Sequence, residues 1–169
     1  MNTRPFSGRG ILPIGLGVSI LLWAVCITLQ HSLPLPQIHL SAGWRWGLAL
    51  LFFADSLGTL LWSGLTLARS QRVNEMARTG AYALVRHPMY GAFLWSGTAT
   101  VAFVFQSWLV LLSVVPLHVV WGRLVQQEEE NLCRQFGSEY ASYAEVTGQF
   151  FPRIASIRKL TEEPRDLDG

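Results

Sequence analysis

A run of 20 residues without a charged side chain, Ile11 to Gln30, constrains this chain more than any other feature. A helix of that length can cross the hydrocarbon core of a bilayer. The run is longer than the apolar core of a signal peptide, and no cleavage site of small residues follows it before Pro34. We therefore expect the run to be retained as a first transmembrane helix.

Three further apolar segments predict transmembrane helices, at residues 44–68, 88–105 and 108–122. Only Gln106 and Ser107 separate the last two segments, which predicts a tight helical hairpin. Hydrophobic residues make up 50% of the chain and charged residues only 14%, whereas soluble proteins contain about 25% charged residues. The pattern therefore predicts an all-α integral membrane protein with four spans.

The predicted spans form one domain, residues 1–169, whose polar end at 161–169 we expect to fray. The loop 32–43 and the hairpin tip carry no Lys or Arg, whereas the N-terminus, the segment 69–86 and the C-terminal tail do. Positive residues favour cytoplasmic loops, so four spans place both termini on the cytoplasmic side. We expect an amphipathic C-terminal helix on that side, and a bacterial inner membrane as the location.

Charge and cysteine usage argue against several other classes of protein. The net charge of +2 is too small to indicate nucleic-acid binding. Cys26 and Cys133 lie in different segments, outside any CxxC pair and away from a histidine at ligand spacing. We therefore expect neither a disulfide nor a metal site.

An acidic cluster follows the fourth predicted span on a helix that we expect to continue to Phe136. On a helical wheel, an apolar stripe that includes Trp121 and Val125 also contains Glu128, and Glu129 lies at its edge. A carboxylate on an apolar stripe needs a buried partner. The partner is either an arginine such as Arg86 or a ligand with a cationic or hydroxyl group, and the pattern leaves both open.

A second cluster, Arg86-His87-Pro88-Met89-Tyr90, lies where the third predicted span begins. Proline suits the first turn of a helix, so we expect the helix to begin near Pro88. Helix N-termini attract anions, and Arg86 and His87 add donors there; a snorkelling arginine and a capping histidine are the alternative. An anion-binding end and an acidic end together suit a zwitterion such as S-adenosylmethionine.

The second span contains one acid, Asp55. At helical spacing Asp55 shares a face with Thr59, Trp62 and Thr66, and a carboxylate facing lipid is costly. We therefore expect this face to point into the protein, with Asp55 as a packing partner or a catalyst.

These clusters, with Phe136-Gly137, Tyr140, Tyr143 and Phe151-Pro152, resemble the isoprenylcysteine carboxyl methyltransferase family, which is related to membrane phospholipid methyltransferases. The resemblance covers about residues 79–153 and implies an S-adenosylmethionine-dependent membrane methyltransferase whose cofactor-binding half is 74–153. It implies cofactor contacts by a set of aromatic, polar and acidic residues, which are Tyr82, His87, Pro88, Met89, Tyr90, Glu128 and Glu129. It also implies an arginine that orients the acceptor, for which Arg86 and Arg123 are the candidates.

The acceptor stays open at this stage. A carboxylate on a lipid or a small hydrophobic molecule is already ionised and needs no base, whereas a phospholipid amine needs one, such as Asp55 or His118. A non-catalytic scaffold, a transporter component and a nicotinamide-dependent reductase are the alternatives of other classes. The sequence leaves the oligomeric state open.

Overall fold

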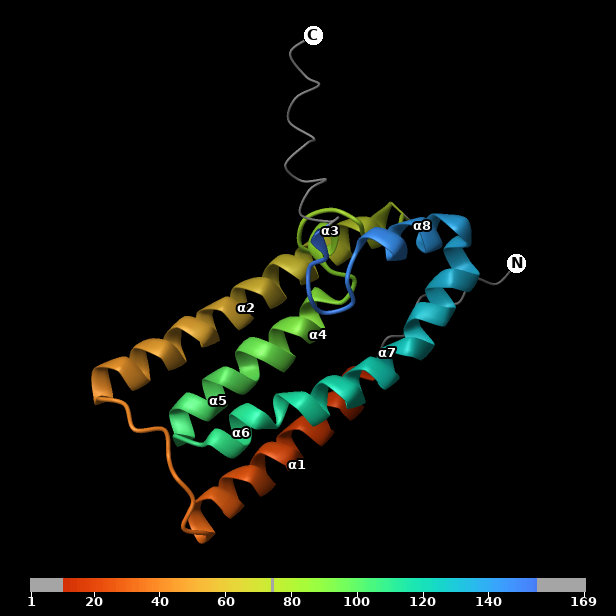
Figure 1. Cartoon of the computed structure of the whole chain (residues 1–169). Helices are drawn as coiled ribbons and strands as arrows, with labels where there is room; N and C mark the ends of the chain where they lie inside the picture. The colour runs from red at the N-terminus through yellow and green to blue at the C-terminus, as the bar shows by residue number, and fades with distance from the viewer. Residues whose placement is uncertain (1–10, 74, 155–169) are drawn as a thin grey trace. The chain divides into compact units, whose positions relative to one another are not determined.

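The computed structural model describes residues 11–73 and 75–154, which are mainly helical (Figure 1). The elements in order are α1 Ile11–Ser32, α2 Ala42–Arg72, α3 Ala81–Leu84, α4 Pro88–Ala92, the π-helix η1 Phe93–Gly97, α5 Thr98–Phe105, α6 Trp108–Leu112, α7 Val114–Phe136 and α8 Ser138–Val146. Within these residues no β-strand forms, and one isolated parallel bridge joins Val85 to Gly148. The predicted all-α class is confirmed, while Arg4, Arg9 and the tail 161–169 lie outside the described residues.

Three helical segments are long and apolar enough to cross a membrane: Ile11–Ser32, Ala42–Arg72 and Trp108–Phe136, the last of which combines α6 and α7. They contain the predicted spans at 11–30, 44–68 and 108–122, as expected of an integral membrane protein. The predicted span at 88–105 is helical throughout but is divided among α4, η1 and α5. A crossing there, the total of four spans and the amphipathic character of the C-terminal helix stay predictions.

The chain groups into two compact units. The first unit comprises Met1–Phe53 and Leu94–Glu130, and the second comprises Ala54–Phe93 and Asn131–Gly169. Helices α2 and α7 contribute residues to both units.

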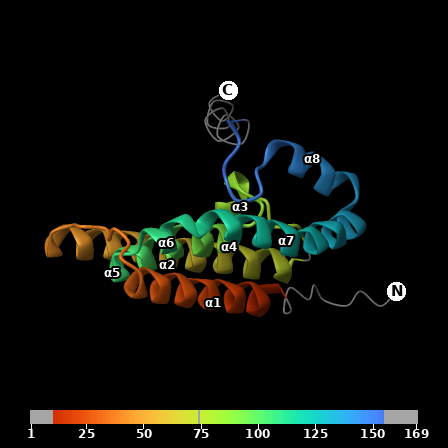
Figure 2. The same ribbon diagram turned by 60° about the horizontal axis from the view of Figure 1, so that its bottom comes forward.

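In the first unit, α1 runs beside α6 and the first half of α7 (Figures 1 and 2). Trp121 on α7 is fully buried, and its Nε1 donates a hydrogen bond to Ser19 Oγ at 3.1 Å. A Cβ added to Gly15 would lie 2.4 Å from the Trp121 ring. Small residues on α1 therefore let a large aromatic ring seat directly on the helix backbone, as is common between membrane helices.

The predicted hairpin tip is confirmed. Helix α5 ends at Phe105, Gln106 takes a left-handed conformation with φ of 54°, and Ser107 begins the next helix. The Ser107 hydroxyl accepts a hydrogen bond from the backbone N–H of Val110 at 3.2 Å, as an N-cap should. Two residues are enough to reverse the chain because one adopts the left-handed conformation and the other caps the new helix.

The connection between α1 and α2 is attached to this hairpin tip. Gln30 is 1% exposed, donates through Nε2 to the carbonyl oxygen of Pro36 at 2.9 Å, and accepts through Oε1 from the Ser107 hydroxyl at 3.2 Å. The backbone N–H of Ile38 donates to the carbonyl oxygen of Gln106 at 2.9 Å. Buried polar groups of the loop thus find partners on the hairpin, which removes much of the cost of burying them.

Helix α2 contains 31 residues, which gives a length of about 46 Å. The hydrocarbon core of a bilayer is about 30 Å thick, so the helix reaches beyond it. The prediction that Asp55 faces inward is wrong, because Asp55 is exposed and the buried positions of α2 are Ala49, Ser56, Ser63 and Thr66. Small side chains occupy the inner face because they allow close packing, and the hydroxyls of Ser56 and Thr66 donate to the carbonyl oxygens of Ala92 and Trp62.

The contact between Gly15 and Trp121 predicts that alanine substitutions at two glycines of α1 have different effects on the free energy of unfolding. Replacement of Gly15 by alanine should lower the free energy of unfolding in detergent micelles by about 1–3 kcal/mol, because the ring must move. Gly17→Ala is the matched control, since nothing lies within 4 Å of a Cβ there, and it should stabilise the helix slightly. Equal stabilities of the two variants would contradict the packing described here.

Candidate functional site

The cluster Arg86-His87-Pro88-Met89-Tyr90 lies between two short helices of the second unit. Helix α3 ends at Leu84, Val85 is extended, Arg86 lies in a bend, and α4 begins at Pro88 with His87 at its N-cap. The predicted helix start at Pro88 is therefore confirmed. Proline fits there because a first-turn residue has no intrahelical use for a backbone N–H.

A C-terminal segment after α8 pairs with the residues between α3 and α4. The backbone N–H of Arg86 donates to the carbonyl oxygen of Gly148 at 2.8 Å, and that of His87 donates to Gln149 at 3.0 Å. The isolated bridge between Val85 and Gly148 belongs to the same pairing. The pairing fixes the backbone on both sides of Arg86 in a defined register.

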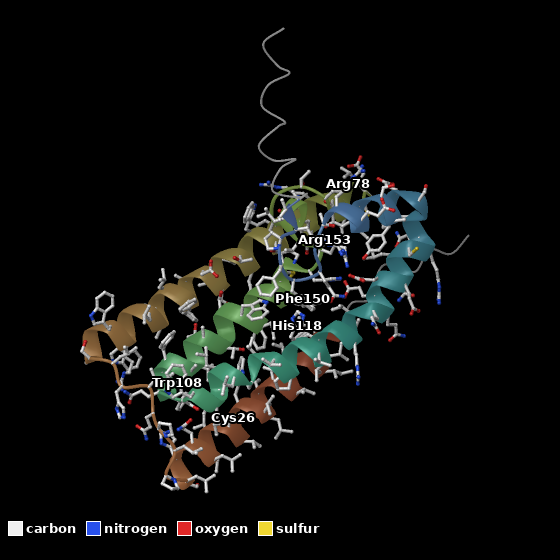
Figure 3. All side chains as sticks on the ribbon, viewed as in Figure 1. Cys26, Arg78, Trp108, His118, Phe150 and Arg153 are labelled. Carbon is white, nitrogen blue, oxygen red and sulfur yellow. The ribbon has the colours of Figure 1, made fainter. Side chains whose placement is uncertain are left out.

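The side chain of Arg86 contacts the end of α8. Its NH1 group donates to the carbonyl oxygens of Ala144, at 3.0 Å, and of Thr147. The exposed Arg153 adds a hydrogen bond from NH1 to the carbonyl oxygen of Glu145 at 2.7 Å (Figure 3). The last carbonyls of a helix lack intrahelical partners and carry partial negative charge, so two guanidinium groups stabilise this helix end.

His87 is buried, with 5% of its surface exposed. Its ring stacks on that of Tyr90 at 5.6 Å between centroids and lies 6.1 Å from the Phe150 ring. Gly91 allows the C-terminal segment to come close, because a Cβ there would lie 3.3 Å from the carbonyl oxygen of Phe150. Pro88 is also buried, and Met89 is half-buried.

Tyr82, a predicted cofactor contact, is held through its backbone. The Tyr143 hydroxyl on α8 donates to the carbonyl oxygen of Tyr82 at 2.7 Å. The Tyr143 ring also contacts that of Tyr140, with 6.1 Å between centroids. The two tyrosines quoted from the C-terminal motif therefore lie on the helix that supports the cluster.

The acidic cluster lies on α7, at the end of the first unit. Glu128 is buried, with 9% of its surface exposed, and the helix also buries Leu117, Trp121 and Val125. The prediction that Glu128 falls on the apolar stripe is confirmed. Glu129 is half-buried, whereas Glu130 and Arg123 are exposed.

His118 lies on the same helix, two to three turns before Glu128 (Figure 3). Its side chain is half-buried, and its ring lies 5.8 Å from that of Trp95 on η1. Residues ten positions apart on an α-helix differ by about 80° around its axis. His118 and Glu128 therefore lie on adjoining faces of α7.

The structure brings Tyr82, Arg86, His87, Pro88, Met89 and Tyr90 together in the second unit, and it places Arg123, Glu128 and Glu129 on one helix of the first. That both sets bind one molecule stays a prediction. Among the described residues, no group of three His, Cys, Asp or Glu side chains gathers in a way that could hold a metal ion.

Sequence reasoning missed the contribution of residues 147–150. Their carbonyl oxygens and the Phe150 ring hold the cluster, yet backbone acceptors carry no signature in side-chain chemistry. Gly148 offered a signal, because a Cβ at that position would lie 1.7 Å from the carbonyl oxygen of Phe151. A position where no side chain fits indicates that the backbone passes close to itself or to a neighbouring segment.

Comparison with known sequences adds to this picture. The sequence model of the isoprenylcysteine carboxyl methyltransferase (ICMT) family matches residues 49–134. The nickel-cobalt-cadmium resistance protein NccN of Alcaligenes xylosoxydans xylosoxydans is 26% identical over 98 residues, which cover 58% of this chain and 45% of that protein. The cobalt-zinc-cadmium resistance protein CzcN of Cupriavidus metallidurans is 27% identical over 113 residues, which cover 66% of this chain and 51% of that protein. The chain spans about half the length of the curated relatives it matches.

The hydrogen bond between Tyr143 and Tyr82 predicts a local loss of stability. Tyr143→Phe should lower the free energy of unfolding by about 0.5–1.5 kcal/mol, because the carbonyl of Tyr82 loses its partner. Unfolding in detergent, followed by circular dichroism, measures the change. Ser142→Ala, at an exposed neighbouring position on α8, is the control and should not destabilise the protein; the same loss in both variants would refute the bond's contribution.

Proposed function

Because this chain belongs to the isoprenylcysteine carboxyl methyltransferase family, we propose that it is an integral membrane methyltransferase that uses S-adenosylmethionine. The family match carries this proposal, since residues 49–134 include both the cluster from Arg86 to Tyr90 and the acids on α7. The proposed acceptor is lipid-borne or a small hydrophobic molecule, in keeping with helices that are long and apolar enough to cross a membrane.

The donor groups of the two clusters fit the chemistry of this cofactor. Its carboxylate suits hydrogen-bond donors such as a His87 ring nitrogen, and its ammonium or ribose hydroxyls suit Glu128. A carboxylate buried on the apolar face of a helix costs free energy unless it meets such a group. We propose that His87, Pro88, Met89 and Tyr90, with Tyr82, bind one end of the cofactor and that Glu128 and Glu129 bind the other.

Bound S-adenosylmethionine would supply a methyl carbon on a positively charged sulfur, which an acceptor takes up in line. A carboxylate acceptor is ionised at neutral pH, so the chain need not supply a base. The chain has to align the acceptor and exclude water, and alignment alone is worth about 7–11 kcal/mol. We assign the alignment to Arg123, which is exposed on α7, because NH1 of Arg86 is engaged by carbonyls of α8.

A phospholipid amine is the second candidate acceptor. It must lose a proton before it attacks, so it needs a base. His118 favours this alternative, because it is half-buried beside Trp95 and lies on the same helix as Glu128. The two acceptors thus differ in whether activity depends on His118.

The names of the relatives suggest a role for the product. Two proteins that match the chain are named for resistance to nickel, cobalt, zinc and cadmium. We propose that methylation of a membrane component by this chain contributes to tolerance of such ions. The basic residues before and after the spans favour an orientation with both termini and the site on the cytoplasmic side.

Cofactor binding is tested by ligand-induced stabilisation of the purified protein. S-adenosylhomocysteine at 100 times its dissociation constant should raise the free energy of unfolding by about 2.7 kcal/mol. Glu128→Gln should abolish the shift, whereas Glu130→Gln, which removes the same charge from an exposed position of α7, should retain it. A shift with NADPH alone would overturn the methyltransferase assignment, and a normal shift in Glu128→Gln would remove Glu128 from the site.

The acceptor is tested with a radiolabelled methyl donor and total lipid extract. A methyl ester releases labelled methanol in mild alkali, whereas an N-methyl group does not, so we expect an alkali-labile lipid product. His118→Gln should leave this activity within a few-fold of wild type, because a carboxylate needs no base. An alkali-stable product that depends on His118 would instead establish the amine acceptor.

A further inference from the structure

The residue pair Arg86 and His87 is held between two supports within the second unit. The backbone of the pair is bonded to the C-terminal segment, through Gly148 and Gln149. The side chain of Arg86 is bonded to α8, through the carbonyl oxygens of Ala144 and Thr147. Arg86 therefore joins the connection between α3 and α4 to α8 and to Thr147, which follows α8.

Arg86 and His87 contact different partners. The Arg86 side chain bonds the carbonyl oxygens of Ala144 and Thr147, whereas the His87 ring stacks on that of Tyr90 and lies 6.1 Å from that of Phe150. The backbone N–H groups of Arg86 and His87 donate to consecutive carbonyl oxygens, those of Gly148 and Gln149, so a shift of this pairing would move the His87 ring away from its aromatic neighbours.

Capping of α8 alone does not account for an arginine at this position. Arg153 also donates to carbonyl oxygens at the end of α8, at 2.7 Å to Glu145 and 3.5 Å to Ala144, and it lies outside the connection between α3 and α4. What Arg86 adds is a link in which the same residue bonds the helix end with its side chain and the C-terminal segment with its backbone N–H.

We propose that Arg86 is a positioning residue, which fixes the register of residues 85–87 on residues 147–149 and thereby holds His87 and Tyr90 in their binding orientation. The step from orientation to cofactor affinity rests on the proposed function; the register itself does not. Arg86 on this view contacts neither the cofactor nor the acceptor, and it acts through His87.

The experiment compares Arg86→Gln, Arg86→Lys and the capping control Arg153→Gln in the full chain in detergent. Amide hydrogen exchange of residues 85–91 should be faster by about tenfold or more in Arg86→Gln and unchanged in Arg153→Gln. Arg86→Lys should lie between, because an ammonium donates to carbonyls but lacks the fixed planar group. Should Arg86→Gln fail to fold, Arg86→Lys carries the same comparison.

Kinetics then separate positioning from direct contact. In Arg86→Gln, the KM for S-adenosylmethionine should rise about tenfold, while the dependence of the rate on lipid-extract concentration should not change. Arg86→Lys should restore part of the affinity for S-adenosylmethionine. An altered dependence on lipid extract with an unchanged KM for S-adenosylmethionine would place Arg86 on the acceptor and overturn the proposal. Equal effects in Arg153→Gln would also overturn it, since loss of helix capping would then suffice.

Hydrogen exchange distinguishes failure of this inference from failure of the proposed function. If wild-type protein bound neither S-adenosylmethionine nor S-adenosylhomocysteine, the methyltransferase assignment would fall, while faster exchange in Arg86→Gln would still support the positioning role. Unchanged exchange at residues 85–91 in Arg86→Gln would overturn the positioning role even in an active enzyme.

Discussion

The whole structure depends on one requirement of the membrane: each backbone N–H and carbonyl group in hydrocarbon needs a partner within the chain. Helices meet the requirement along their length but leave polar groups at both ends. In this chain, side chains supply partners at several of the breaks. Gln30 and Ser107 serve the loop and the hairpin tip, and Arg86 serves the end of α8.

The same requirement explains why polar residues gather where the chemistry is proposed. The second unit contains short helices and extended residues, each of which exposes backbone groups that need donors or acceptors. The residues that answer this need, such as Arg86 and Tyr143, also fix the positions of His87 and Tyr82. Structural support and the candidate site are therefore made of neighbouring residues rather than of separate layers.

Much of the architecture could be predicted because the responsible signals are local. The dipeptide Gln106-Ser107 between two apolar runs predicted the hairpin, and Pro88 predicted a helix start. The wheel position of Glu128 predicted its burial, since helical period depends only on spacing. These features follow from composition over a few residues and from regular geometry.

Other features could not be predicted, because they depend on partners distant in sequence. The cost of a charge in lipid led us to expect Asp55 on the inner face of α2. The helix instead buries Ser56 and Ser63, whose small side chains allow close packing, and leaves Asp55 exposed. The side chain of Arg86 donates to backbone carbonyl oxygens that lie 58 and 61 residues later in the sequence. A residue of any type could have provided those carbonyl oxygens, so the sequence carries no signal for them. The crossing at 88–105 and the joint binding by both clusters stay predictions.

The π-helix η1 interrupts the helical run from Pro88 to Phe105. A single wide turn of this kind is equivalent to one extra residue in an α-helix, which advances all later side chains by about 100° around the axis. Side chains that follow η1 in sequence therefore point about 100° away from where an unbroken α-helix would carry them. The cluster from His87 to Tyr90 precedes the wide turn, so its own helical phase does not depend on that turn.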